Sequence, residues 1–169
     1  EEFETLLDVI TNPTVLAKRV CQSGEDLLQA SACNYYAPDV TQKEAEDYYN
    51  ALKAKAPNPD QPVMYGMNSR LEHNADGTLT ENTYYTQGLY GTELNCICSH
   101  LENALEYAEN EKQKDIIHLL LKFYQTGSLD IFDQYTIEWV AETDGEIDFV
   151  NGFTEVYGDP LGLKASWEG

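Results

Sequence analysis

Glu155 and Tyr157 place a carboxylate and a phenol two residues apart in a segment, 148–157, that is rich in aromatic and β-branched residues. This composition predicts a strand, and the following Gly158-Asp159-Pro160 predicts a turn. Strand side chains alternate between two faces, so both groups are expected on one face, with Cα atoms ~6.6 Å apart. An extended peptide has a similar distance between its amino nitrogen and its second carbonyl. A peptide lying along the strand could therefore present its ammonium group to Glu155 and that carbonyl to Tyr157.

The same alternation predicts what each face of the strand carries. One face is expected to hold Phe149, Asn151, Phe153, Glu155 and Tyr157. The other face is small and mostly apolar, as packing against a core requires, and holds Val150, Gly152, Thr154 and Val156. Two plainer interpretations stay open on the residues alone. Glu155 could be a solvated surface carboxylate, and Tyr157 could be a core aromatic whose hydroxyl reaches the backbone.

Other residue types give no second catalytic constellation. The three histidines lack the helical spacing to an acid that a zinc motif requires, and no nucleophile elbow or glycine-rich phosphate loop occurs. Segment 74–77 resembles the centre of a calcium loop, but the twelfth position would be Thr83, where a bidentate Glu is needed. Arg70, in the polar run 68–70, could clamp a carboxylate, although a surface or interlobe ion pair is the plainer interpretation.

Charge limits the classes of partner. Thirty acidic residues against ten basic ones give a formal net charge of −20. Such a surface repels phosphate backbones and anionic headgroups, so nucleic acids and membranes are not expected as partners. Cationic ligands such as peptide amino termini and metal ions are favoured, although acidity that serves solubility alone is the plainer interpretation. No run approaches the ~20 apolar residues of a membrane span.

The 169 residues have the length of a single domain, 1–169, which is long enough to bury a sizeable core. The four cysteines lack the spacing of a disulfide framework, and they predict mostly buried free thiols in a reducing compartment, the cytoplasm: Cys21, Cys33, Cys96 and Cys98. Nothing at Glu1 resembles a signal peptide, and the absence of an initiating Met suggests a portion of a longer protein.

Periodicity and capping signals predict a mostly helical chain. The expected helices span 3–10, 13–22, 26–36, 42–56, 92–109, 111–125 and 129–142. Thr41 and Glu44 form a capping box at the start of the fourth. Segments 63–72 and 78–86 predict a β-hairpin, because Asp76-Gly77 is a strong turn signal. The expected fold is α+β and helix-dominated, with a small antiparallel sheet that pairs hairpin 63–86 with strand 146–157.

Four stretches resemble the dipeptidyl peptidase III family of zinc exopeptidases, and its bacterial members in particular. They occur in family order and are ASACNYYA (30–37), MYGMNSRL (64–71), GLYG (88–91) and DFVNGFTEVYGDPLGLKASWEG (148–169). The zinc motifs of that family, H-E-x-x-x-H and E-E-x-R-A-E, have no counterpart here. The chain therefore resembles a middle portion of the lobe that does not bind metal.

The resemblance implies roles for particular residues. The glutamate of the family pattern G-F-x-E-x-Y, here Glu155, helps to hold the amino terminus of the substrate. The tyrosine, here Tyr157, donates to the carbonyl oxygen as negative charge develops. Glu168, in the terminal Trp-Glu-Gly, is implied as a second acid of the same subsite. Asn151 completes the expected substrate-binding set.

The resemblance also implies the activity of a parent protein. That protein would be a zinc-dependent dipeptidyl peptidase that removes dipeptides from peptide amino termini. Its zinc ligands are absent from this chain, which alone is expected to be inactive. The implied partners are an oligopeptide substrate and the missing zinc-binding lobe. Two alternatives stay open: a stand-alone, non-enzymatic module that binds peptides or amines, and an interaction domain whose acidity serves only solvation.

Overall fold

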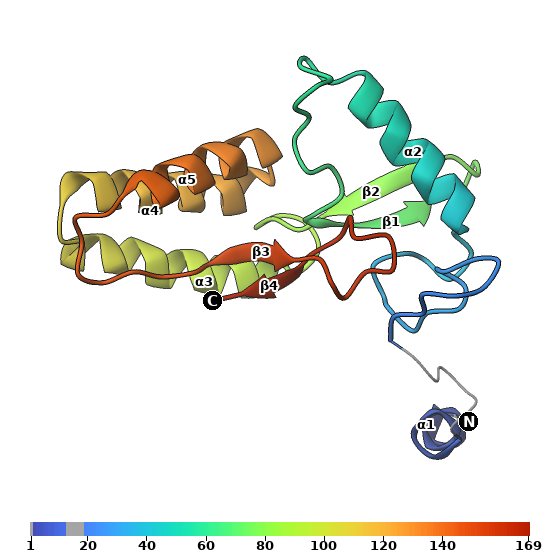
Figure 1. The fold of residues 1–169 in the computed structure, drawn as a ribbon. Coiled ribbons are helices and arrows are strands. Elements are labelled where there is room, and N and C mark those ends of the chain that lie inside the picture. Colours follow the sequence, from blue (N-terminus) through green and yellow to red (C-terminus); the bar gives the residue numbers. More distant parts are fainter. Residues whose placement is uncertain (1, 13–18) are drawn as a thin grey trace.

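The structure, a computed structural model, has the helix-dominated α+β fold that the sequence predicts (Figure 1). It describes residues 2–12 and 19–169. The elements in chain order are α1 (Glu2–Thr11), α2 (Gln42–Ala54), β1 (Ser69–His73), β2 (Leu79–Thr83), α3 (Gly91–Ala104), the 3-10 turn η1 (Leu105–Tyr107), α4 (Glu111–Thr126), α5 (Leu129–Ala141), β3 (Gly152–Glu155) and β4 (Ser166–Glu168). A single domain over 1–169 stays a prediction.

Helices α3, α4 and α5 pack side by side at one end of the molecule, as their short connections predict (Figure 1). Helix α4 begins where the Asn110 side chain accepts the N–H of Gln113, at 2.8 Å, and ends at Gly127, whose φ of 69° is left-handed. The buried side chains of this layer form the helical core, which includes Leu94, Leu101, Ile116, Ile117, Leu120, Leu121, Phe123, Tyr124, Phe132 and Tyr135, with Phe153 from β3.

A second apolar cluster lies at the other end of the molecule, between α2, β1 and the segment before α2. This α2–β1 core consists of Leu28, Tyr35, Tyr36, Val40, Ala45, Tyr49 and Leu71. The predicted capping box of α2 is confirmed: the Thr41 hydroxyl accepts the N–H of Glu44, and the Glu44 carboxylate accepts the N–H of Thr41 at 2.9 Å. The box fixes the direction in which α2 leaves segment 26–40.

The predicted hairpin is confirmed, but the predicted three-stranded sheet is wrong. Strands β1 and β2 are antiparallel, from Ser69 opposite Thr83 to His73 opposite Leu79. Strand 146–157 is reduced to β3, and it pairs with β4 in a separate sheet. The reason lies in segment 156–165, which turns the chain back and offers β3 a nearer partner than the hairpin.

The helix predicted at 26–36 is also wrong. The carboxylate of Asp26 accepts the backbone N–H groups of Leu28 and Gln29 at 2.9 and 3.0 Å, which stabilises turns instead of a helix. The chain then runs beside β1, where the Ala37 N–H donates to the Leu71 carbonyl at 2.8 Å. Tertiary pairing therefore overrides helical propensity here. The helix predicted at 13–22 falls largely on residues 13–18, which lie outside the described residues, and 19–22 are not helical.

Candidate functional site

Strand β3 is seated directly on the helical core. Gly152, at its start, has a φ of 152°, and a Cβ at this position would lie 2.8 Å from the Phe132 ring of α5. Only glycine permits this close approach of backbone to ring. The next residue, Phe153, is 5% exposed and packs among Tyr84, Phe123 and Tyr124. The start of β3 is therefore rigidly placed.

The predicted assignment of faces is wrong for Phe149, Val150 and Phe153, although Val156 packs against the helical core as predicted. Phe149 and Phe153 face the helical core, whereas Val150 is 48% exposed. A β-bulge then interrupts the pairing, because Phe153 lies opposite Trp167 while Glu155 lies opposite Ser166. Ser166 and Trp167 are consecutive and point to opposite faces, so the bulge turns Glu155 to the face away from Phe153. A single extra residue thus redirects the carboxylate from the core side to the outside.

Two of the predicted site residues lie on that outer face, at opposite ends of the paired segment. Glu168 lies opposite Gly152, and Glu155 lies opposite Ser166, two residues before Glu168 on β4. Residues two apart on a strand share a face, so the β3–β4 register gives both carboxylates the same face. The Thr154 hydroxyl lies on this side too, 3.4 Å from Glu168 Oε2. Sequence reasoning had no means of finding this pairing, because it did not predict β4.

Tyr157 lies in the turn that follows β3 and is 73% exposed. The alternative interpretation of Tyr157 as a core aromatic is therefore wrong, and its hydroxyl is open to solvent or a ligand. Glu155 is partly exposed. Because the strand ends at Glu155, strict alternation does not extend to Tyr157, and the shared face of the two residues stays a prediction.

Asn151 has a structural partner. Its Oδ1 accepts a hydrogen bond from the hydroxyl of Tyr124, which itself accepts the Trp167 indole N–H at 2.8 Å. Tyr124 is buried in the helical core, and burial raises the pKa of its phenol, so the group stays a donor. The chain Trp167–Tyr124–Asn151 ties β4 to β3 through α4. A substrate-binding role for Asn151 stays a prediction.

The turn that carries Tyr157 is fixed by a buried carboxylate, Asp159, which the sequence had suggested only as turn chemistry. Asp159 is 4% exposed, and its Oδ2 accepts the Tyr36 hydroxyl at 2.9 Å and the N–H of Lys164 at 2.9 Å. Oδ2 also accepts the N–H of Leu163 at 2.8 Å. These bonds anchor segment 156–165 to the α2–β1 core.

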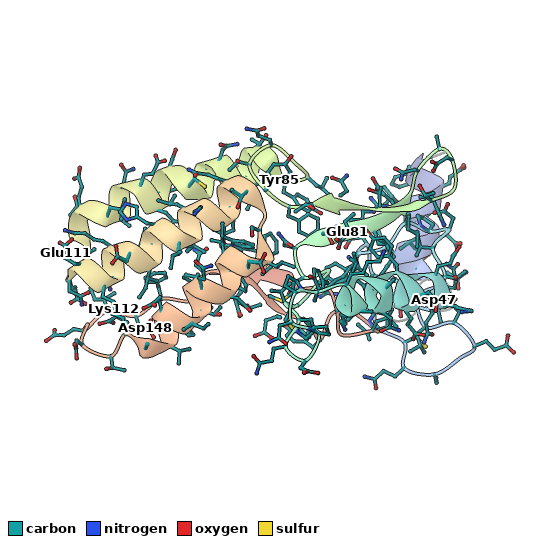
Figure 2. The ribbon with its side chains drawn as sticks, turned by 90° about the horizontal axis from the view of Figure 1, so that it is seen from above. Asp47, Glu81, Tyr85, Glu111, Lys112 and Asp148 are labelled. Atoms are coloured by element: carbon teal, nitrogen blue, oxygen red, sulfur yellow. The ribbon has the colours of Figure 1, made fainter. Side chains whose placement is uncertain are left out.

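A buried cation completes that anchor. The Lys164 ammonium has no solvent exposure and donates to the Tyr49 hydroxyl at 2.6 Å and the Ser69 carbonyl at 2.9 Å. It also lies 4.9 Å from the centre of the Tyr49 ring. Glu81 of β2, which is labelled in Figure 2, extends this network. Its carboxylate accepts the hydroxyls of Tyr49 and Ser69 at 2.9 and 2.6 Å. Burial lowers the pKa of Lys164 to about 8. Sequence reasoning missed this group, since a lone Lys among turn residues gives no signal of burial.

An aromatic pocket of about 680 Å³ lies on the other face of the β3–β4 pair. It is lined by Phe153 and Trp167 from the strands, by Tyr84 and Tyr90, and by Ile97 of α3. Phe153 and Trp167 are direct partners across the strands, so this pocket lies on the side opposite Glu155. The acidic face and the aromatic pocket are therefore separate features of one two-stranded sheet.

The thiols are less buried than predicted. Cys98 is buried, Cys33 is half-buried and Cys96 is exposed, and these three form no disulfide. Burial raises the pKa of the Cys33 and Cys98 thiols, so both stay protonated near neutral pH. Among residues 2–12 and 19–169, no group of three or more His, Cys, Asp or Glu side chains is placed to hold a metal ion.

Comparison with known proteins identifies the class. Residues 18–169 match the model of Peptidase family M49, and the chain belongs to this family of peptidases. The resemblance found in the sequence is thereby confirmed. Among curated relatives, dipeptidyl peptidase 3 of Dictyostelium discoideum is 25% identical over 150 residues, covering 80% of this chain and 21% of that protein. Dipeptidyl peptidase 3 of Mus musculus is 25% identical over 152 residues, covering 89% and 20%. The chain thus spans about a fifth of the length of these relatives.

Solved structures agree at the level of the fold. The structure of DPP III from Caldithrix abyssi aligns with a TM-score of 0.59 and 24% identity, over 80% of this chain and 24% of that one. Dipeptidyl-peptidase III from Corallococcus sp. strain EGB aligns with a TM-score of 0.57 and 21% identity, over 79% and 23%. At these identities the likeness concerns the fold alone.

Proposed function

We propose that this chain is the substrate-binding part of a dipeptidyl peptidase that removes dipeptides from the amino termini of peptides. Membership of a peptidase family and relatives named dipeptidyl peptidase 3 support the reaction class. The observation that carries the assignment to these residues is the β3–β4 register, which gives Glu155 and Glu168 one face next to the exposed Tyr157.

The two carboxylates are suited to a peptide amino terminus. An ammonium group offers three N–H donors and a positive charge, and two acids on one strand pair can accept from it together. Asp159 and Lys164 anchor segment 156–165, which includes the turn that carries Tyr157, to Tyr36 and Tyr49. Because this support is rigid, the face is prepared before the peptide arrives, which reduces the ordering cost of binding.

Tyr157 would act one peptide unit further along. A phenol hydroxyl can donate one hydrogen bond to a carbonyl oxygen. A donor aimed at the oxygen where negative charge develops contributes ~2.7–4 kcal/mol to transition-state stabilisation. In this role Tyr157 binds the carbonyl oxygen more strongly as the reaction proceeds, which raises kcat.

Zinc belongs to the same proposal only through the parent protein. The described residues do not provide a cluster of metal ligands, so they do not fit a zinc site. The zinc of the parent, its missing lobe and the inactivity of this chain alone therefore stay predictions. The contribution of the chain is to bind, orient and polarise the peptide.

Substitution of Tyr157 in the full-length enzyme tests the proposal. Tyr157→Phe removes one hydroxyl and is expected to lower kcat about 10²-fold or more, because an oxyanion donor is lost. Steady-state kinetics with a dipeptidyl chromogenic substrate would measure this, and metal analysis should find an unchanged zinc content. The matched control is Tyr107→Phe, since Tyr107 is 81% exposed on η1, in the helical layer. Normal turnover by the Tyr157 variant would reject the role.

Calorimetry separates the alternatives that are not enzymes. Tripeptides titrated into the 169-residue chain should release or absorb heat if the acidic face binds peptide amino termini, and Glu155→Gln should weaken that binding. An interaction domain would give no heat.

Within the described residues, no helix is both long and apolar enough to cross a membrane. The cytoplasmic location expected from the thiols stays a prediction.

A further inference from the structure

Arg70, on β1, carries a buried nitrogen that has nothing to bond with. Its Nε is inaccessible to solvent and has no hydrogen-bond acceptor among the residues that the structure describes. A guanidinium group has five N–H donors and no acceptor capacity, and it remains charged at every physiological pH. A buried, unmatched donor of this kind is rare in folded proteins and calls for a partner.

The acids among the described residues do not supply that partner. Glu72 lies two residues further along β1, on the same face as Arg70, but its carboxylate lies 3.5 Å from the amide of Asn82 instead. Over residues 2–12 and 19–169, no carboxylate forms an ion pair with Arg70. In a chain with 30 acidic and 10 basic residues, this is not a shortage of acids but a matter of placement.

Arg70 instead lines a pocket. The pocket has a volume of about 300 Å³ and lies between β1 and segment 28–40, with Ser31, Asn34 and Pro38 among its lining residues. Backbone hydrogen bonds of Leu71 to Tyr35 and Ala37 hold that segment against β1. The residues that line the pocket are therefore held in place by the backbone pairing of the fold. The space suits one small planar group rather than an extended peptide.

The geometry points to a carboxylate as the ligand of Arg70 in this pocket, supplied from outside the 169 residues. The planar guanidinium fork matches both carboxylate and phosphate oxygens. The net charge of −20 disfavours a dianionic phosphate more strongly than a single negative charge, so the carboxylate is the better match. Two sources share this chemistry. One is an Asp or Glu side chain of a longer polypeptide, since the relatives are about five times as long as this chain. The other is a free small monocarboxylate.

Arginine side-chain NMR tests this directly, because the chain has only two arginines, Arg19 and Arg70. In a ¹H–¹⁵N spectrum of the Nε–H groups, sodium acetate at constant ionic strength should shift the Arg70 signal saturably, with sodium chloride as the control. The Arg19 signal should not follow, and Arg19→Lys assigns the two signals. Acetate that binds the folded chain should also raise its thermal midpoint. Arg70→Lys keeps the charge but loses the planar fork, so the acetate concentration needed for the same rise should increase at least tenfold.

The same spectrum of a longer polypeptide distinguishes the sources. If an acidic side chain occupies the pocket, the Arg70 signal should already lie at the acetate-bound position and ignore added acetate. If the ligand is a free carboxylate, the signal should remain acetate-sensitive there. The proposal is overturned if the Arg70 signal shifts only as Arg19 does in the 169-residue chain and stays at its ligand-free position in the longer one.

Discussion

The helical core and the α2–β1 core are held together by different interactions. The helical core is a stack of apolar and aromatic side chains, with ring centres such as those of Phe123 and Phe132 only 4.7 Å apart. The α2–β1 core has buried polar groups at its edge, and Lys164 reaches across 115 residues of sequence to Tyr49. One region is stabilised mainly by burial of apolar area, and the other also depends on a hydrogen-bonded network that must be complete.

The difference separates stability from positioning. Apolar packing tolerates small shifts, whereas a buried ammonium needs each of its acceptors in place. The segment that carries Tyr157 is attached to the second region through Asp159 and Lys164. The predicted site therefore relies on the polar network for its geometry and on the helical layer for the seat of β3.

The largest expected effect is on the apolar side of this comparison. Phe123→Ala, at a fully buried ring in α4, should lower the free energy of unfolding by ~3–5 kcal/mol, because a large cavity opens among packed rings. Denaturant titration followed by circular dichroism would measure the change. Tyr107→Ala, at an exposed ring, should stay within ~0.5 kcal/mol of the wild type. Equal losses would contradict the assignment of the helical core.

The next effect concerns pH and isolates the polar network. Burial lowers the pKa of Lys164 to about 8 in the folded chain, while the unfolded value lies near 10.4. Between these values the unfolded state holds more protons, so this group makes the free energy of unfolding rise with pH by about 1.4 kcal/mol per unit. The contribution of Lys164 to the free energy of unfolding is complete above pH ~10.4, the pKa in the unfolded state, and it is lost as the pH falls through about 8, the pKa in the folded state.

Comparison with Lys164→Met removes the contribution of other titrating groups, since burial raises the pKa of Cys98 and of several tyrosines and these act in the opposite direction. The difference in unfolding free energy between wild type and variant, measured at pH 7.5, 8.5 and 9.5, should grow in favour of the wild type. A difference that is constant with pH would mean that the ammonium is not desolvated as the structure has it.

A smaller loss is expected when the acceptor of the turn changes. Asp159→Asn removes the charge that strengthens three hydrogen bonds to one oxygen, and should cost ~1.5–3 kcal/mol. Chemical denaturation measures the loss, and Asp115→Asn, at an exposed carboxylate on α4, is the control. The variant should also raise the proteolytic sensitivity of segment 156–165. Unchanged stability and protection would show that Asp159 does not anchor the turn.

The smallest expected effect concerns helix capping, and it compares α2 in one region with α5 in the other. Thr41→Ala breaks the capping box of α2 and should cost ~1 kcal/mol. Ser128 occupies the equivalent position before α5 but makes no side-chain capping bond, so Ser128→Ala should change stability little. Thermal unfolding of the two variants side by side gives the comparison. A larger loss at Ser128 than at Thr41 would reverse it.

Local signals account for the parts that sequence reasoning predicted correctly. The periodicity of α2, α4 and α5 and the capping box of α2 are encoded within a few residues, and so is the turn of the hairpin. The helix expected at 26–36 failed because Ala37 and Tyr35 bond with Leu71, more than 30 residues away. No pattern within a short window carries that information.

The candidate site divides in the same way. The strand pattern and the family resemblance predict Glu155, Tyr157 and Glu168 as site residues, and the exposure of Tyr157 is compatible with that prediction. The shared face of the two acids depends on a bulge and on β4, which were not predictable from alternation. The unmatched Arg70 and the buried Lys164 became visible only through their surroundings.

The bulge in β3 means that the acidic face depends on how the two strands pair and not on the spacing of its residues in the sequence. If β3 kept all its residues and paired without the bulge, Glu155 would share the face of Phe153 and point toward the aromatic pocket, although every side chain of the site would still be encoded. Removal of Thr154, in contrast, would leave Glu155 directly after Phe153 and opposite Ser166, so its face would be kept. In an evolving sequence a one-residue gap at this point is therefore compatible with the acidic face, whereas an unbroken run of matching residues does not guarantee it.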